Sequence, residues 1–237
     1  IKHEKMIDWI NLNEKLKEST KQLYIACYKS FLNHLERISY GWFKSIKETS
    51  KSISLRNKKT TRILTLKEWE EFNRALEEIN HRDSLIARCM LQGARRISEI
   101  LEIKIPNIDF HHSIIHFWKS KHNGDMREIP ISYPKKFMSE LESYIAETAE
   151  VRGKSHLLFI TRNGKPLTRS RLNHSFLEAS KKAQIQNVTP QMLRATWVAL
   201  TKSKGIPEEE IMKVTGHTTK RLISSTDKNI SQDIILI

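Results

Sequence analysis

The stretch Thr189–Trp197 (TPQMLRATW) restricts the fold more than any other part of this chain. Thr189 suits a helix N-cap, and Pro190 suits the first helical position. Apolar side chains then recur at helical spacing, which predicts a helix buried on one side. Arg194 lies among them, where a guanidinium group is costly unless it meets an anion. That anion is either a carboxylate of the protein, in a structural salt bridge, or a ligand.

Net charge narrows the class of partner. The 237 residues carry +14, and residues 1–62 hold +8 of it. Such an excess favours a polyanion, most often nucleic acid, although solubility alone is the simpler explanation. No apolar run is long enough to span a bilayer, no signal peptide is visible and no basic amphipathic helix stands out. We therefore expect no membrane association and a cytoplasmic location. Because the first residue is Ile1, we expect a fragment or a trimmed chain.

Cysteine and histidine usage points away from metal chemistry. Cys27 and Cys89 both fall inside helical patterns, so we expect reduced core residues. The histidines lack paired metal spacing, and no C-x-x-C motif is present. We expect no metal and no cofactor. His111-His112 is typical of a turn rather than of a ligand pair.

Three regions follow one another along the chain. Residues 1–48 predict a helical unit, with one helix near 2–12 and a second that starts at Ser19 or Thr20. On the second, Tyr24, Cys27, Tyr28, Phe31, Leu35 and Ile38 share a face. Residues 49–62 read as a polar, basic linker without an acid. If DNA is the partner, this linker should lie along phosphates through Lys51, Arg56, Lys58, Lys59 and Arg62; the alternative is a solvated linker that contacts nothing.

Residues 63–237 form the third region and carry clear local signals. Thr65–Glu68 is a capping box, and the next helical block ends at Gly93. Ser113–Trp118 and Arg127–Ser132 alternate around Asn123-Gly124, which predicts a β-hairpin with Lys119 and Lys121 near its loop. Further expected elements are a helix opened by Tyr133-Pro134, a strand at Leu157–Ile160, a helix over 169–184 that carries Arg169 and Arg171, and a helix over Pro207–Val214.

Four motifs in order resemble the tyrosine recombinase (phage integrase) family. They are Arg96 within Arg-Ile-Ser-Glu, Lys121 on the hairpin, Leu193-Arg194 after Thr189-Pro190, and Thr215-Gly216-His217. The likeness covers roughly residues 63–228, and residues 1–48 resemble the last part of that family's helical core-binding domain. It implies a mainly α fold with a small antiparallel β-sheet (α+β), in which the two domains clamp duplex DNA.

A closer likeness is to the integrase-like proteins of the chlamydial virulence plasmid. The segments that carry it are Ile79–Ala87, Met90–Gly93, Tyr133–Met138 and Ile211–His217.

The resemblance assigns chemical roles to the matching residues. Arg96 and Arg194 would clamp the phosphate with forked donors that lysine cannot copy. Lys121 would protonate the leaving 5′ oxygen, with Lys119 as its rival, and His217 would hydrogen-bond the phosphate. The alternatives are that Arg96 only pairs with Glu99, that Lys121 is a solvated lysine and that His217 caps a helix. Arg95, Arg169 and Arg171 are expected to contact DNA as well.

Two positions depart from the family pattern. Gln191 stands where the family usually has histidine; glutamine can donate to a phosphate oxygen but cannot move a proton near neutral pH. Thr226 stands where the family has its nucleophilic tyrosine, and no tyrosine follows Tyr144. A threonine hydroxyl is far less acidic than a phenol, so it could not easily form and resolve a covalent DNA intermediate.

Two main hypotheses for function remain open. The first is a site-specific recombinase or integrase acting on double-stranded DNA. The second is a DNA-binding regulator of plasmid maintenance, replication or transcription that does not cut. An RNA-binding helical protein is disfavoured because no aromatic stacking platform is apparent. Family members form dimers and tetramers on DNA by exchanging C-terminal segments, and the apolar tail Ile234–Ile237 suits that role. Its alternative is a frayed terminus.

Overall fold

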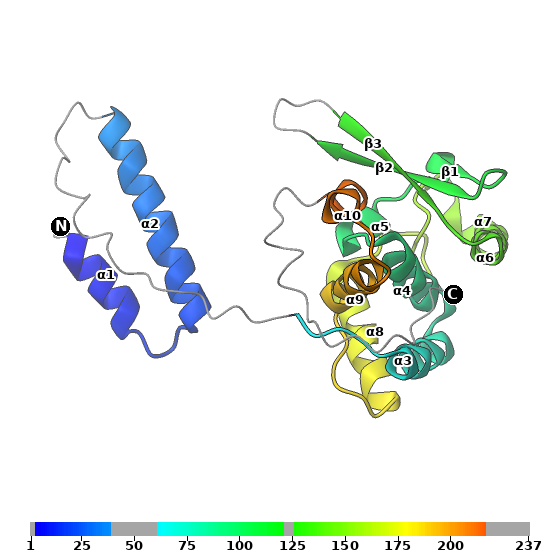
Figure 1. The fold of residues 1–237 in the computed structure, drawn as a ribbon, viewed down its shortest axis with the longest axis horizontal. Helices are drawn as coiled ribbons and strands as arrows, with labels where there is room; N and C mark the ends of the chain where they lie inside the picture. Colours follow the sequence, from blue (N-terminus) through cyan, green and yellow to red (C-terminus); the bar gives the residue numbers. More distant parts are fainter. Residues whose placement is uncertain (1–2, 39–60, 121–125, 217–237) are drawn as a thin grey trace. The chain divides into compact units, whose positions relative to one another are not determined.

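The fold consists of two compact units, residues 1–58 and 59–237 (Figure 1). The structure is a computed structural model that describes residues 3–38, 61–120 and 126–216. The boundary between the units falls inside the basic segment 49–62. Each unit is described by itself.

The first unit pairs α1 (His3–Leu12) with α2 (Glu18–Ile38). Its buried apolar side chains are Ile10, Ile25 and Leu32. The expected inner face of α2 is wrong, because Tyr24 and Phe31 are 45% and 55% exposed. Cys27 is exposed too, so it is not the core residue that the pattern predicted. The reason is that α2 buries the narrow stripe spaced by seven residues, one position along from the broader stripe read from the sequence.

The second unit is mostly helical. Its elements are α3 (Leu66–Ile79), α4 (His81–Gly93), α5 (Ile97–Leu101), a short 3₁₀ helix (Ile105–Asn107), β1 (Ile108–Asp109), β2 (Ile114–Ser120), β3 (Met126–Ser132), α6 (Lys135–Glu147), α7 (Ala149–Arg152), α8 (Arg169–Lys182), α9 (Pro190–Ser203) and α10 (Glu208–Thr215). The predicted class, mainly α with a small antiparallel sheet, is confirmed.

The sheet has the order β1-β2-β3, with every pairing antiparallel. The predicted hairpin is confirmed: Ile115 pairs with Ile131 and Phe117 with Ile129, and all four side chains are buried in the main core. Strand alternation sends the intervening residues to the opposite face. There Trp118 and Met126 are about half exposed, at 51% and 57%.

Helix α9 packs against α4 and α10 in the second unit (Figure 1). Thr189 caps it by accepting a hydrogen bond from the Met192 amide, and Pro190 is its first residue, as predicted. Every residue from Met192 to Thr201 is buried. The prediction of one-sided burial was therefore wrong, because neighbouring helices cover α9 all round.

Most of the other elements predicted for the second unit are present, and one predicted strand is not. The Thr65–Glu68 capping box is present, α6 starts after Pro134, and α8 ends two residues earlier than predicted. His111 and His112 lie in the turn between β1 and β2. Leu157–Ile160 is not a strand. It forms two isolated bridges, Lys104 with Leu157 and Ile160 with Pro166, because its two ends pair with different segments.

A small apolar cluster attaches α10 to the rest of the second unit. Ile211 packs with Ala94, Trp197 and Val198. This contact fixes the C-terminal end of α10, at Thr215, beside the α4–α5 turn. None of the helices in the described ranges is both long enough and apolar enough to cross a membrane.

Candidate functional site

An open pocket of about 520 Å³ lies where the α4–α5 turn, the first turns of α8 and the start of α9 meet. We call it the arginine pocket, because Arg95, Arg96, Arg169 and Arg194 line it. The remaining lining residues are Met90, Ile97, Ser98, Asn173, Asn187, Val188, Thr189, Pro190 and Gln191. No carboxylate is among these described residues. The pocket is therefore strongly cationic, which suits an anion.

The α4–α5 turn sends two consecutive arginines in opposite directions. Ala94 ends α4 in the left-handed conformation, with φ of 52°, and Arg96 is extended as the N-cap of α5. Arg95 is consequently 1% exposed, whereas the side chain of Arg96 is 46% exposed. Arg96 is thus the member of the pair that a ligand can reach directly.

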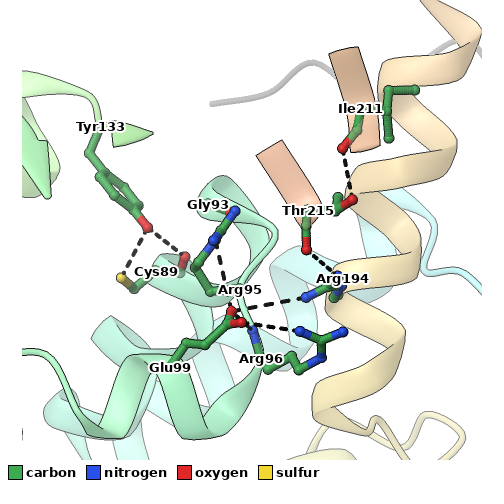
Figure 2. A network of polar contacts seen from close by, with 9 residues as sticks. All are labelled: Cys89, Gly93, Arg95, Arg96, Glu99, Tyr133, Arg194, Ile211 and Thr215. Carbon is green, nitrogen blue, oxygen red and sulfur yellow. Dashed lines mark hydrogen bonds and ion pairs between the residues drawn. The ribbon is translucent and has the colours of Figure 1, made fainter. Parts of the chain in front are cut away.

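Glu99 is the carboxylate that this cluster shares (Figure 2). Its Oε2 accepts a hydrogen bond from the Arg96 backbone amide at 2.8 Å, and its Oε1 accepts one from Arg96 Nη1 at 3.2 Å. The same Oε2 lies 4.0 Å from both Arg95 Nε and Arg194 Nη1. The pairing of Arg96 with Glu99, the alternative considered for Arg96, is therefore present. One carboxylate nevertheless faces three guanidinium groups, so positive charge remains.

Arg194 enters the cluster from the buried helix α9, and its side chain is only 3% exposed. Its Nη2 donates to the Thr215 carbonyl at 2.5 Å, at the end of α10 (Figure 2). Burial and the neighbouring positive charge of Arg96 lower its pKa to about 10, while Glu99 opposes that shift. An anion bound beside Arg194 would raise this pKa again.

Arg95 joins the cluster to the sheet. Its Nε donates to the Gly93 carbonyl at 2.9 Å, and its guanidinium carbon lies 5.1 Å from the centre of the Phe117 ring on β2. Burial lowers its pKa. No residue in the described ranges accepts a hydrogen bond from its Nη2. We expected a DNA-contacting residue, but the side chain lies under the pocket rather than at its mouth.

Close packing holds this turn in place. Tyr133 donates to the Cys89 carbonyl at 3.2 Å, and a Cβ atom on Gly93 would lie 2.0 Å from the Tyr133 hydroxyl oxygen. Cys89 is buried, as predicted, and burial raises the pKa of its thiol to about 12. The approach to α9 is anchored as well, because the Val188 amide donates to Ser180 Oγ of α8 at 2.9 Å.

The structure brings together some of the residues that the sequence predicted for a DNA-binding site. Arg96, Gln191, Arg194, Arg95 and Arg169 line one pocket. Arg171 lies instead in another hollow, and Arg62 pairs with Glu68. Lys119 is on β2 opposite Arg127. Outside the described residues lie Lys51, Arg56, Lys58, Lys59, Lys121, His217 and Thr226.

The sequence did not predict three polar residues that line the pocket, and it predicted only one of the arginine contacts of Glu99. Asn173, Asn187 and Thr189 line it, and Glu99 is shared by three arginines. Glu99 had a signal, since it stands three residues after Arg96. The asparagines had none, because exposed polar residues are common on helices and loops. No group of three or more histidine, cysteine or acidic side chains placed to hold a metal occurs in the parts of the chain that the structure describes.

The model of the phage integrase family matches residues 62–226, which is more than half of the chain. The chain belongs to the phage integrase family. The matched range contains the whole arginine pocket and ends at Thr226.

Two virulence plasmid integrases are similar to this chain in sequence. The virulence plasmid integrase pGP8-D of Chlamydia muridarum (strain MoPn / Nigg) is 37% identical over 223 residues, which cover 91% of this chain and 66% of that protein. The chain thus spans slightly less than two thirds of that relative's length. The virulence plasmid integrase pGP7-D of the same organism is 31% identical over 214 residues, covering 88% of this chain and 68% of that protein.

Solved structures share the fold. The XerH site-specific recombinase bound to palindromic difH substrate superposes with a TM-score of 0.76 at 16% identity, covering 93% of this chain and 67% of that one. The Tn1549 transposon integrase in complex with a circular intermediate DNA gives 0.73 at 15% identity, covering 93% and 79%.

Proposed function

We propose that this protein binds double-stranded DNA in the manner of a tyrosine recombinase and holds one backbone phosphate in the arginine pocket. The observation that carries the proposal is the lining of that pocket, which offers four guanidinium groups and no carboxylate among the described residues. Phosphate oxygens match the forked donors of arginine. Arg96 donates from the exposed side, and Arg194 donates from the buried side.

The pocket is suited to the chemistry that the family carries out. Attack on a phosphodiester builds negative charge on the non-bridging oxygens, and preorganised cations stabilise that charge. Arg194 is fixed by α9 and by the Thr215 carbonyl, so little reorganisation is needed when the phosphate arrives. Gln191, at the pocket wall, would donate to a phosphate oxygen without moving a proton. Lys121 and His217 are proposed to complete the set as general acid and hydrogen-bond donor.

Site-specific recombination or integration is the activity proposed from family membership. DNA complexes of two structural relatives, XerH and the Tn1549 integrase, support a DNA partner. The relatives with the higher sequence identity are named as integrases of a virulence plasmid. A plasmid or integrated element is accordingly the proposed setting, and a cytoplasmic, DNA-associated location goes with it.

One observation favours a second candidate function. No tyrosine follows Tyr144, and Thr226 occupies the position nine residues after His217 where the family has its nucleophile. A threonine alkoxide is a poor leaving group, so resolution of a covalent intermediate would be slow. The second candidate is a protein that holds DNA on the same scaffold without cutting it and regulates plasmid maintenance, replication or transcription.

A covalent trapping experiment separates the two candidates. A duplex nicked near the scissile position is incubated with the purified protein and run on a denaturing gel. A band of slower mobility that survives denaturation supports a recombinase with a nucleophile outside position 226. Absence of that band, together with salt-sensitive binding to the intact duplex, supports the regulator. Absence of duplex binding refutes the proposal as a whole.

The assembly on DNA is proposed on the same basis. The helical unit and the larger unit would clamp the duplex, with the basic residues of 49–62 along its backbone. A dimer or tetramer would form through the apolar tail Ile234–Ile237 docking on a neighbouring copy. Size-exclusion chromatography with light scattering, with and without duplex, tests the assembly directly.

A further inference from the structure

A second cationic hollow lies near the arginine pocket and has no role so far. Its volume is about 300 Å³, and its lining residues are Asn80, Arg82, Thr161, Arg162, Asn163, Leu167 and Arg171. We call it the second hollow. Three of these described residues are arginines, and no carboxylate lines it.

One of the three arginines, Arg82, is buried and already hydrogen-bonded within the protein. Arg82 is 8% exposed, its Nε donates to Asp83 Oδ1 at 2.8 Å, and its Nη1 donates to the Ile160 carbonyl at 2.8 Å. Asp83 is 1% exposed, so its negative charge compensates that of Arg82 inside the protein. Arg162 and Arg171 are exposed, and no acidic side chain of the described ranges lies in an ion pair with either. Glu147 lines an adjoining hollow together with Arg82 and Arg162, so the three arginines of the second hollow outnumber the nearby carboxylates Asp83 and Glu147.

The loop that presents Arg162 is held in a single turn. The Thr161 amide donates to the Lys165 carbonyl at 2.8 Å, and the Gly164 amide donates to the Thr161 carbonyl at 3.0 Å. Gly164 has φ of +70°, and a Cβ atom there would lie 2.3 Å from the Val151 carbonyl oxygen. Arg162 is thus presented from a preorganised turn, which lowers the entropy lost on binding an anion.

Helix α8 connects this hollow to the arginine pocket. Its first residue, Arg169, lines the arginine pocket, and Arg171, two residues later, lines the second hollow. Two residues on a helix point about 200° apart, so the first turn of α8 separates two cationic sites. The N-terminal end of a helix also favours negative charge. The two sites share the first turn of one helix, and a partner that contacts both must carry more than one negative charge.

We propose that the second hollow binds a second phosphate of the DNA backbone, through Arg162 and Arg171. This inference rests on the proposed DNA binding and adds a phosphate contact outside the arginine pocket. The same charges could attract an acidic protein segment, but regular spacing and forked donors favour the phosphates of nucleic acid.

The test measures how the affinity for a random duplex depends on salt. Each phosphate contact contributes about 0.9 to the slope of log K against log salt. The R162Q/R171Q variant should lose about that much slope relative to K135Q/K154Q, a matched variant that removes two exposed lysines elsewhere on the same unit. Lysine keeps the charge, so R162K/R171K should recover the slope. Melting temperatures verify that all three variants fold.

Two outcomes overturn the inference. Equal slopes for R162Q/R171Q and K135Q/K154Q would remove the second hollow from the DNA interface. Loss of binding to an acidic peptide, with the duplex slope intact, would assign the hollow to a protein partner. Either result leaves the proposed function standing if the wild-type protein binds the duplex and R96Q weakens it. Failure of the wild-type protein to bind any duplex refutes the proposed function instead.

Discussion

Nη1 of Arg194 lies 4.0 Å from Oε2 of Glu99, too far for a hydrogen bond but close enough for strong attraction. The same carboxylate makes its hydrogen bonds with Arg96. Glu99 therefore faces Arg194 as a nearby charge, while its hydrogen bonds go to Arg96. A phosphate oxygen in the arginine pocket would add a second anion to this cluster of three guanidinium groups.

The first prediction concerns removal of this carboxylate. The substitution Glu99→Gln should lower the free energy of unfolding by about 1–2 kcal/mol, because three arginines lose their shared counter-charge. Inorganic phosphate should then raise the melting temperature more in this variant than in the wild type. Glu102→Gln, on an exposed residue at the end of the same helix, is the control. A phosphate effect equal in both variants would contradict the shared role of Glu99.

The two site arginines should separate binding from stability. Arg96→Ala removes a side chain that is 46% exposed, so stability should change by less than about 0.5 kcal/mol while duplex affinity falls about tenfold. Arg194→Ala should also weaken binding, and it should cost about 1–3 kcal/mol because the Thr215 carbonyl loses its donor. Chemical denaturation and fluorescence anisotropy measure the two effects. Affinity unchanged in Arg96→Ala would exclude it from phosphate contact.

Thiol chemistry should distinguish the two cysteines. Cys27 is exposed, whereas Cys89 is buried with a pKa raised to about 12. A thiol reagent should titrate one equivalent in the native protein and two in denaturant. Because the folded-state pKa of Cys89 lies above its ordinary value of 9.0, its contribution to stability is complete below pH 9 and is lost as the pH rises toward 12. In Cys89→Ala this part of the alkaline loss should disappear.

Gly93 should tolerate no side chain while Tyr133 is present. A Cβ atom there would lie 2.0 Å from the tyrosine hydroxyl, so Gly93→Ala should cost about 1–3 kcal/mol. Tyr133→Phe alone should cost about 1 kcal/mol, because the hydrogen bond to the Cys89 carbonyl is lost. The double variant should be less destabilised than the sum of the two. Additive losses would mean that the contact relaxes in another way.

The basic linker should act through its charge. Lys58 and Lys59 lie in the acid-free segment 49–62. Replacing both with glutamine should flatten the dependence of duplex affinity on salt, since counterion release scales with phosphate contacts. The K135Q/K154Q variant serves as the matched control. A slope equal to that of the control would show that the linker remains in solvent.

The sequence predicted the elements whose signals are local. The capping box at Thr65, the cap and proline at Thr189-Pro190, and the alternating hairpin each depend on residues a few positions apart. The family motifs also predicted that Arg96 and Arg194 lie at one site, and both line the arginine pocket. Their contact with phosphate stays a prediction.

Features that depend on distant neighbours were not predictable. Leu157–Ile160 is apolar like a strand, but its pairing is divided between Lys104 and Pro166. Arg95 and Arg96 are neighbouring residues of the same type, so the sequence does not show which one is buried. The left-handed backbone of Ala94 decides it. On α2 the covering helix, not the apolar count, selected Ile25 and Leu32 over Tyr24 and Phe31.

Helix α9 is buried along its whole middle, and this has a consequence for how the site moves. Backbone amides near Arg194 can exchange with solvent deuterium only when the core of the second unit opens. Amides of the turn that carries the exposed residues Arg162 and Asn163, in contrast, lie at the surface. Hydrogen exchange should therefore find Arg194 on the slowest-exchanging segment of the unit and Arg162 on a faster one. In the proposed complex with DNA, the exposed arginines would adjust to the duplex while Arg194 stays fixed.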